Sequence, residues 1–308
     1  MPHGGRARGG TLVTSADGMA PLPLPARRDV GLGTAYERWA VYELLGKWLA
    51  KEPPATALEG PVDGMAGIPG LHLLPAAARG ARVTVIVPDE EGVEVVRGVY
   101  RTAGLEDRLD ARAGAAWPEE SFDLVLTYNA LPAVPDWKGY LAEAAAHARR
   151  QLVISVTHPG SYGVFLRRAL RLAEPGEKPL EPFDHPSSSP RALEPELHRF
   201  GRITGDAYVD CPWWPCLSVE TGETLLTGTL SRLPFGARFR RGPAAAAPAA
   251  QEQEPFLYGP GRFPFFGGDG WADEFQPALR THPNLEGSRY RALAGLLAHQ
   301  RIWRIDRT

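Results

Sequence analysis

A run of glycines and acidic residues in the first quarter of the chain is the clearest candidate for ligand binding. It contains Glu59, Gly60, Asp63, Gly64 and Gly67. Glycine lets a backbone approach a bound molecule closely, and a carboxylate forms strong hydrogen bonds with a cationic donor. Glu59 and Asp63 are both candidates for that carboxylate, and the sequence leaves the two alternatives open.

Polar side chains also follow three later runs of apolar residues. Asp89 and Glu90 come after a β-branched run, Tyr128 and Asn129 end a second apolar run, and His158 follows a third. A carboxylate in such a position can accept hydrogen bonds from the hydroxyl groups of a ribose. An imidazole can remove a proton from a reacting group, although the alternative interpretation of His158 is a surface or capping histidine.

Strands and helices that alternate along the chain must position these residues. Buried strands are predicted for residues 82–87, 121–128 and 152–156, and a shorter apolar stretch at 57–58 precedes the glycines. Helices are predicted for residues 93–103, 136–148 and 161–173. A further helix is predicted to begin at Thr34, with Glu37 closing a capping box, and to end before Pro53.

This alternation predicts an α/β fold with a doubly wound and mostly parallel sheet. In such sheets, ligands bind at the carboxyl ends of the strands, close to the point where the strand order reverses. The turns at 59–70, 88–91, 112–117 and 128–132 are therefore expected to form one site, with 157–162 close by.

The pattern changes beyond residue 175. A helix is predicted to start at Ser189 and Pro190 and to stop at Gly201. Strands at 203–209 and 224–230 are predicted to pair in antiparallel fashion, and residues 289–303 are predicted to contain another helix.

The order of these elements resembles that of the class I S-adenosylmethionine-dependent methyltransferases over residues 35–230. The resemblance rests on the acidic glycine-rich turn, on the acidic pair after the second strand, and on the segment Trp117–Val125 with its Phe-Asp-Leu-Val string. It implies a mostly parallel sheet with a C-terminal antiparallel hairpin and S-adenosylmethionine as the cofactor. It also implies a direct displacement in which the protein mainly orients the reactants.

The resemblance assigns parts of the cofactor to particular residues. The glycines, with Glu59 or Asp63, would hold the methionine part, and Asp89 or Glu90 would hold the ribose. The family often places an acidic residue beside the adenine. Because residues 112–117 contain none, a backbone contact at Ala115 is expected to replace it.

The remaining candidate site residues lie at the fourth and fifth predicted strands. Tyr128 or Asn129 is expected to line the pocket where cofactor and acceptor meet, and His158 is the candidate general base. Asp123 is interpreted as a structural residue at the strand entrance, since motif residues often have that role.

Two other functions fit parts of the sequence. A nicotinamide-dependent oxidoreductase fits the glycine spacing and the acid near residue 89. A non-catalytic Rossmann-like partner protein fits the missing adenine acid and the irregular first turn. The oxidoreductase does not account for the Phe122–Val125 string and the antiparallel end of the sheet as well as a methyltransferase does.

The bulk composition limits the choice of partners. The 308 residues carry a formal net charge of -2, so no global basic field would attract nucleic acid or acidic lipid. No apolar run approaches the roughly 18 residues that span a membrane. Cys211 and Cys216 are the only cysteines and match no zinc pattern, so no metal is expected. A cytoplasmic protein that acts on a small-molecule acceptor is predicted.

Three segments are predicted along the chain. Residues 1–33 form a flexible arm, 34–235 the Rossmann-like domain, and 236–308 a C-terminal extension with a spacer and a terminal helix. The aromatic string at 208–216 is either a wall of the acceptor pocket or a packed connection between strands. The string at 256–266 is either a lid or a strap that holds the tail on the core.

Overall fold

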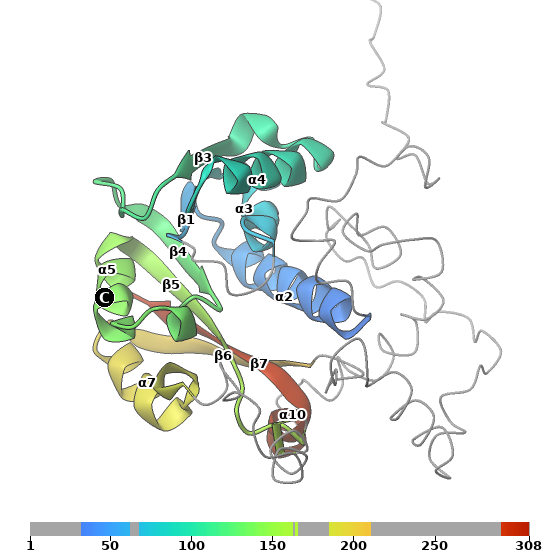
Figure 1. Ribbon diagram of the computed structural model, residues 1–308, viewed down its shortest axis with the longest axis vertical. Coiled ribbons are helices and arrows are strands. Elements are labelled where there is room, and N and C mark those ends of the chain that lie inside the picture. Colours follow the sequence, from blue (N-terminus) through green and yellow to red (C-terminus); the bar gives the residue numbers. More distant parts are fainter. Residues whose placement is uncertain (1–31, 62–67, 163, 166–184, 211–290, 308) are drawn as a thin grey trace, which may run out of the picture.

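The computed structural model describes residues 32–61, 68–162, 164–165, 185–210 and 291–307. These residues form a seven-stranded sheet with helices on both faces (Figure 1). The strand order is β3-β2-β1-β4-β5-β7-β6. The strands are β1 Thr56–Glu59, β2 Arg82–Val87, β3 Leu109–Ala113, β4 Phe122–Tyr128, β5 Ala148–Thr157, β6 Arg202–Asp210 and β7 Ala298–Asp306.

The first five strands are parallel to one another, and β7 runs antiparallel to both β5 and β6. The chain moves from β1 outward through β2 to β3 and then returns to β4 on the other side of β1. The strand order therefore reverses between β1 and β4, which is where ligands bind in sheets of this kind. The predicted fold class is confirmed.

Helices cover the two faces separately. One face carries α2 (Leu32–Lys51), α3 (Leu74–Ala77) and α4 (Glu90–Thr102), and the other carries α5 (Trp137–His147) and α7 (Pro190–His198) (Figure 1). A short helix, α10 (Arg291–Leu297), precedes β7. Buried apolar side chains fill a separate core layer on each face of the sheet.

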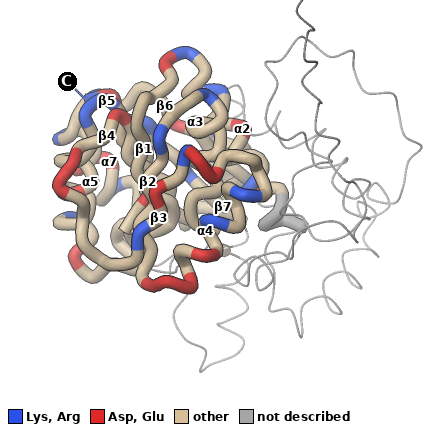
Figure 2. Tube along the Cα trace, turned by 90° about the horizontal axis from the view of Figure 1, so that it is seen from above, with Lys and Arg blue, Asp and Glu red and all other residues tan. Residues whose placement is uncertain are grey.

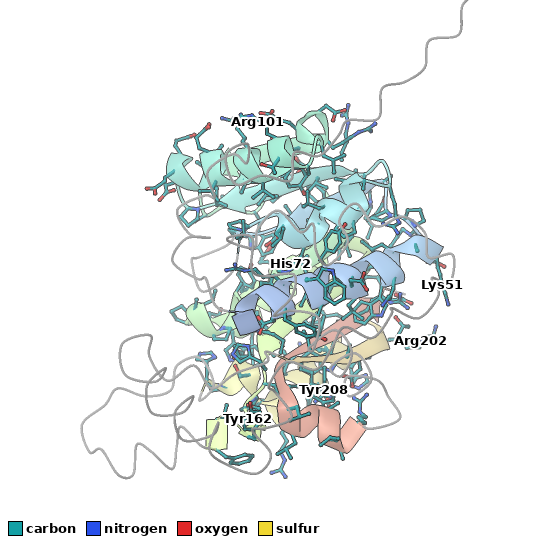
Figure 3. The ribbon with its side chains drawn as sticks, turned by 90° about the vertical axis from the view of Figure 1, so that its right-hand side faces the viewer. Lys51, His72, Arg101, Tyr162, Arg202 and Tyr208 are labelled. Carbon is teal, nitrogen blue, oxygen red and sulfur yellow. The ribbon has the colours of Figure 1, made fainter. Side chains whose placement is uncertain are left out.

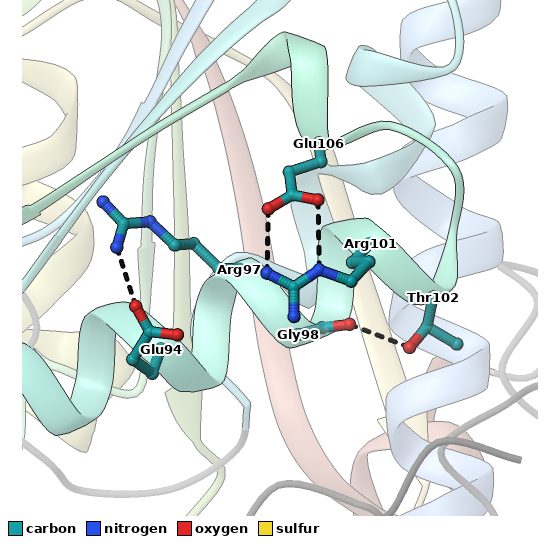
Figure 4. Close-up of polar contacts among 6 residues, drawn as sticks. All are labelled: Glu94, Arg97, Gly98, Arg101, Thr102 and Glu106. Carbon is teal, nitrogen blue, oxygen red and sulfur yellow. Dashed lines mark hydrogen bonds and ion pairs between the residues drawn. The ribbon is translucent and has the colours of Figure 1, made fainter.

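The helix α4 illustrates why the predicted helices form. Asp89 is its N-cap and accepts a hydrogen bond from the amide of Gly92 at 2.8 Å. Its apolar side chains face the core, while its exposed side carries the ion pairs Arg97–Glu94 and Arg101–Glu106 (Figure 4). Exposed pairs of this kind contribute little, so the buried face supplies most of the stability.

Helix α2 begins at Leu32, two residues before the predicted N-cap Thr34. The capping-box prediction for Glu37 is therefore wrong. Glu37 lies within the helix, where its carboxylate is buried and contacts other elements. Hydrogen bonds to those elements replace the local one, because a buried carboxylate must find donors.

Strand β3 was not predicted, because its sequence lacks an apolar run. It lies at the edge of the sheet and alternates charged and apolar residues, with Asp110 and Arg112 on its exposed side. Edge strands are solvated along one side and often carry charge. The turn predicted for 112–117 consequently begins one or two residues later, after Ala113.

The C-terminal strand changes the predicted end of the sheet. The partner of β6 is β7, and the predicted partner strand at 224–230 lies outside the described residues. The helix predicted within 289–303 ends at Leu297, after which the chain is extended. Because β7 lies between β5 and β6, part of the sheet comes from the segment that the sequence placed in a C-terminal extension.

In the part of the chain that the structure describes, no helix is both long enough and apolar enough to cross a membrane.

Candidate active site

The carboxyl end of β1 carries a buried acidic group. Glu59 is the last residue of β1, is 2% exposed, and accepts a hydrogen bond from the amide of Gly70 at 3.0 Å. Burial raises the pKa of its carboxyl group to about 8, although the Gly70 amide opposes the shift. The side chain is therefore a buried acid at the point where the strand order reverses.

The loop that follows Glu59 is fixed at both ends. Gly60 has a φ of 126°, and a Cβ there would lie 2.6 Å from the backbone oxygen of Ile86, so glycine is required. The hydroxyl of Tyr140 donates to the carbonyl of Pro61 at 2.9 Å, and that of Tyr100 donates to the carbonyl of Gly70 at 3.2 Å. Two helices on opposite faces of the sheet thus hold the two ends of the loop.

Three predicted members of this loop, Asp63, Gly64 and Gly67, lie outside the described residues. Of the two candidate acids, Glu59 and Asp63, only Glu59 belongs to the described residues, with the position and the burial given above.

The carboxyl end of β4 carries an unsatisfied acceptor. Asn129 has a φ of 51°, is 1% exposed, and donates its backbone amide to the carbonyl of Ser155 at 3.0 Å. Its Oδ1 atom is buried and has no hydrogen-bond partner among the described residues. A buried acceptor without a partner is costly, so a donor supplied by a ligand would stabilise this side chain.

Tyr128, the neighbour of Asn129, faces the protein interior. Its ring packs against the buried ring of His72 at 4.1 Å between centroids, and its hydroxyl donates to Glu37 at 3.0 Å. His72 lies beside α2 (Figure 3). Burial, together with the charge of Arg38, lowers the pKa of His72 to about 3, so the ring is neutral.

The ends of β2 and β3 are more open. Asp89 and Glu90 are exposed, and one oxygen of Asp89 caps α4. The amide of Gly114 donates to the carbonyl of Val87 at 2.8 Å and keeps the turn after β3 beside the end of β2. Ala115, next in the chain, is exposed at this edge.

His158 lies farther along the same edge, after β5. Its ring contacts that of Tyr208 edge-on at 5.2 Å between centroids, and its backbone amide donates to the carbonyl of His299 at 2.7 Å. Tyr208 lies close to α10 (Figure 3). Burial and the charge of Arg301 lower the pKa of His158 to about 4, and a hydrogen bond with the backbone of Gly295 opposes the shift.

Asp123 has the structural role predicted for it. Its carboxylate accepts hydrogen bonds from the amides of Ala55 and Thr56 at 2.8 and 3.3 Å and pairs with Arg149 at 3.1 Å. These contacts lie where β1 and β4 begin, at the opposite edge of the sheet from Glu59. Asp123 thereby ties the starts of the two strands together.

The aromatic string after Tyr208 continues outside the described residues, as do Cys211, Cys216 and the string at 256–266. Polar residues that the sequence did not indicate join the site instead. Glu37, His72, His299 and Gln300 come together through tertiary packing alone.

Comparisons with known proteins agree with this geometry. Residues 65–151 match a family model described as a methyltransferase domain. A comparison with curated proteins gave no match.

Solved structures with similar folds include magnesium protoporphyrin IX methyltransferase from Synechocystis PCC 6803 with bound SAH. It is 16% identical over 59% of this chain and 80% of that chain, with a TM-score of 0.46. The StiE O-MT is 12% identical over 86% of this chain and 72% of that chain, with a TM-score of 0.44. The [4+2]-cyclase SpnF is 13% identical over 87% and 80%, with a TM-score of 0.42. Likenesses at this level carry no argument about the acceptor.

Residues 65–151 thus match a methyltransferase domain, and the described sheet has the mostly parallel, doubly wound order of the class I fold.

Proposed function

We propose that the protein is an S-adenosylmethionine-dependent methyltransferase that acts on a small-molecule acceptor and holds its cofactor at the carboxyl ends of β1, β2 and β4. The observation that carries the proposal is the buried carboxyl group of Glu59 beside the strand reversal, at the start of a loop whose ends are fixed by two tyrosines. A cationic amine next to this carboxyl would favour its ionised form and offset the cost of its burial.

The other contacts follow from the order of the strands. Asp89 or Glu90 would accept hydrogen bonds from the ribose hydroxyls, and the backbone at Ala115 would face the adenine edge. Asn129 would offer its unsatisfied Oδ1 to a donor of the cofactor or the acceptor. Tyr128 would support the pocket from the interior side, since its hydroxyl is fixed by a hydrogen bond to Glu37.

The predicted loop residues keep their proposed roles. Gly60 and the glycines Gly64 and Gly67 would let the backbone approach the methionine part, with Asp63 nearby.

S-adenosylmethionine supplies a methyl group on a positively charged sulfur, which an acceptor nucleophile can displace. The chain's own contribution is to orient the acceptor and to exclude water from the edge of the sheet. His158 is the candidate proton acceptor from the sequence, and its ring is neutral at pH 7 because its pKa is lowered to about 4.

The charge distribution supports a small acceptor. The net charge is -2, and positions of Lys and Arg alternate with positions of Asp and Glu along the described Cα trace (Figure 2). A charge distribution of this kind does not concentrate nucleic acid or an acidic membrane.

The acceptor class can be tested with S-adenosylmethionine that carries a radioactive methyl group. The purified protein is incubated with it and a cell extract, which is then separated into small molecules, proteins and nucleic acids. The label is expected in the small-molecule fraction, and Glu59→Gln should reduce it strongly because the cofactor loses a charged partner. Glu106→Gln, which removes an exposed carboxylate beyond the C-terminal end of α4, is the matched control. Label mainly in protein or nucleic acid would contradict the proposal.

A further inference from the structure

A buried polar network links α2 to the start of β7. The carboxylate of Glu37 accepts hydrogen bonds from the hydroxyl of Tyr128 at 3.0 Å and from Nε2 of Gln300 at 3.3 Å. Its second oxygen pairs with Nδ1 of His299. The hydroxyl of Ser155 donates to Gln300 at 3.1 Å and extends the network into the sheet. Glu37 is therefore held in place by three side chains, which come from β4 and β7.

The topology places His299 at the ligand-binding edge. Strand β7 runs antiparallel to β5, so the start of β7 lies where β5 ends, and Gln300 pairs with Thr157. The carbonyl of His299 accepts a hydrogen bond from the backbone amide of His158, which is the first residue after β5. His299 thus comes from near the C-terminus but lies at the edge where the parallel strands end.

Exposure distinguishes His299 from the rest of the network. Glu37, Gln300 and Ser155 are buried, whereas the side chain of His299 is 17% exposed. Because Glu37 binds Nδ1, the Nε2 atom lies on the side of the ring directed away from the carboxylate. A histidine whose Nδ1–H donates to a buried carboxylate is held in one tautomer and orientation, with Nε2 as the basic nitrogen.

We propose that His299, oriented by Glu37 and less buried than His158, takes the proton from a hydroxyl group of the acceptor in place of His158, so that this methyltransferase is an O-methyltransferase. This inference rests on the proposed function. Alcohols and phenols are protonated at neutral pH and must lose a proton when they are methylated, which is the task that such a pair performs. Carboxylate acceptors already carry the charge and need no base.

The step balances in atoms and electrons. The hydroxyl oxygen forms a bond to the methyl carbon, the carbon–sulfur bond breaks, and its electron pair stays on sulfur, which leaves S-adenosylhomocysteine. The hydroxyl proton moves to Nε2 of His299. The resulting imidazolium is stabilised by the carboxylate of Glu37 and later returns the proton to solvent.

The first experiment measures transfer of radioactive methyl groups to matched one-ring compounds. Phenol and benzyl alcohol present hydroxyls, whereas benzylamine and benzoate present an amine and a carboxylate. Transfer to the hydroxyl compounds is expected, and His299→Asn and Glu37→Gln should each lower kcat by roughly 100-fold or more. His198→Asn, which changes an exposed histidine on α7, should keep the wild-type rate. Transfer only to benzylamine or benzoate would overturn the proposal.

A purely structural role for the pair predicts different results. If Glu37 and His299 only tied α2 to β7, the variants would lose stability and S-adenosylhomocysteine binding without a change in the pH profile of transfer. The proposal predicts unchanged calorimetric binding of S-adenosylhomocysteine and loss of the acidic limb of the pH–rate profile in His299→Asn. A His299→Asn enzyme with wild-type kcat and pH profile would overturn it.

A readout independent of turnover is carbethoxylation by diethyl pyrocarbonate, followed on individual histidines by mass spectrometry. His299 should be modified, as should the exposed His198, whereas the fully buried His72 should be protected. Protection of His299 while His198 reacts would overturn the proposal, because the ring would then be out of reach of an acceptor. Failure of the wild-type protein to bind S-adenosylhomocysteine would overturn the proposed function itself, which separates the two cases.

Discussion

Glu59 is a buried acid at the carboxyl end of β1, so its ionisation depends on the charge of the group that lies beside it. In the ligand-free protein, burial raises the pKa of its carboxyl group from 4.5 to about 8, so the group is mainly protonated at pH 7. A cationic amine placed beside it favours the carboxylate and lowers that pKa again. Binding and proton release are therefore linked at this residue.

This linkage predicts that binding of S-adenosylhomocysteine at pH 7 releases close to one proton from the protein. Calorimetric titrations in two buffers with different heats of ionisation measure that number directly. Glu59→Gln should bind more weakly and release no proton, because its side chain is neutral in both states. Equal proton release by wild type and Glu59→Gln would show that another group is responsible.

The sequence indicated some site residues and not others for a physical reason. Glu59, Asp89 and Asn129 lie at strand ends that are recognisable from the local pattern, so their shared edge follows from the rule for parallel sheets. Glu37 and His299 join the site only because α2 and β7 pack against the sheet. No local sequence pattern predicts a contact between residues that are so far apart in the chain.

At the scale of elements, the close packing of α2 on β6 depends on a glycine. A Cβ at Gly205 would lie 2.9 Å from Cζ2 of Trp48 and 3.1 Å from Cβ of Arg304. Both neighbours belong to packed elements, so a side chain at this position would force them apart.

Gly205→Ala should therefore lower the free energy of unfolding by about 1–3 kcal/mol. The matched substitution is Gly98→Ala in α4, where a Cβ meets nothing within 4 Å (Figure 4). It should raise stability by up to about 1 kcal/mol, since alanine favours a helix over glycine. Urea unfolding compares the two variants, and a stable Gly205→Ala protein would mean that α2 packs less closely on β6.

The sequence pattern predicted some strands correctly and missed others. Strand β2 was predicted with its observed bounds because both of its faces are covered, which selects a continuous β-branched run. Strand β3 is a half-exposed edge strand, and polar and charged residues interrupt β7, so neither carries such a run. The predictions failed where a strand's surroundings, and not its composition, determine its conformation.

At the scale of the whole molecule, the C-terminal segment completes the sheet. Strand β7 lies between β5 and β6 and supplies the fully buried Trp303 and Ile305 to the core. Its removal would leave β6 without its partner and expose the edge of β5.

A chain that ends at residue 297 should therefore lose cooperative unfolding, as should the fragment 34–235 that the sequence delimited as a domain. A chain that ends at Asp306 retains all of β7 and is the control. Circular dichroism during thermal unfolding measures cooperativity in each case. A sharp transition in the 34–235 fragment would contradict the role assigned to β7.

The central claim, a cofactor site beside Glu59, is tested most directly by calorimetric titration of the full chain with S-adenosylmethionine and S-adenosylhomocysteine, with NADH as the control ligand. The account predicts saturable binding of both sulfur compounds, weaker binding in Glu59→Gln, unchanged binding in Glu106→Gln and no binding of NADH. Absence of binding to a folded wild-type protein, or equal binding by Glu59→Gln, would contradict it.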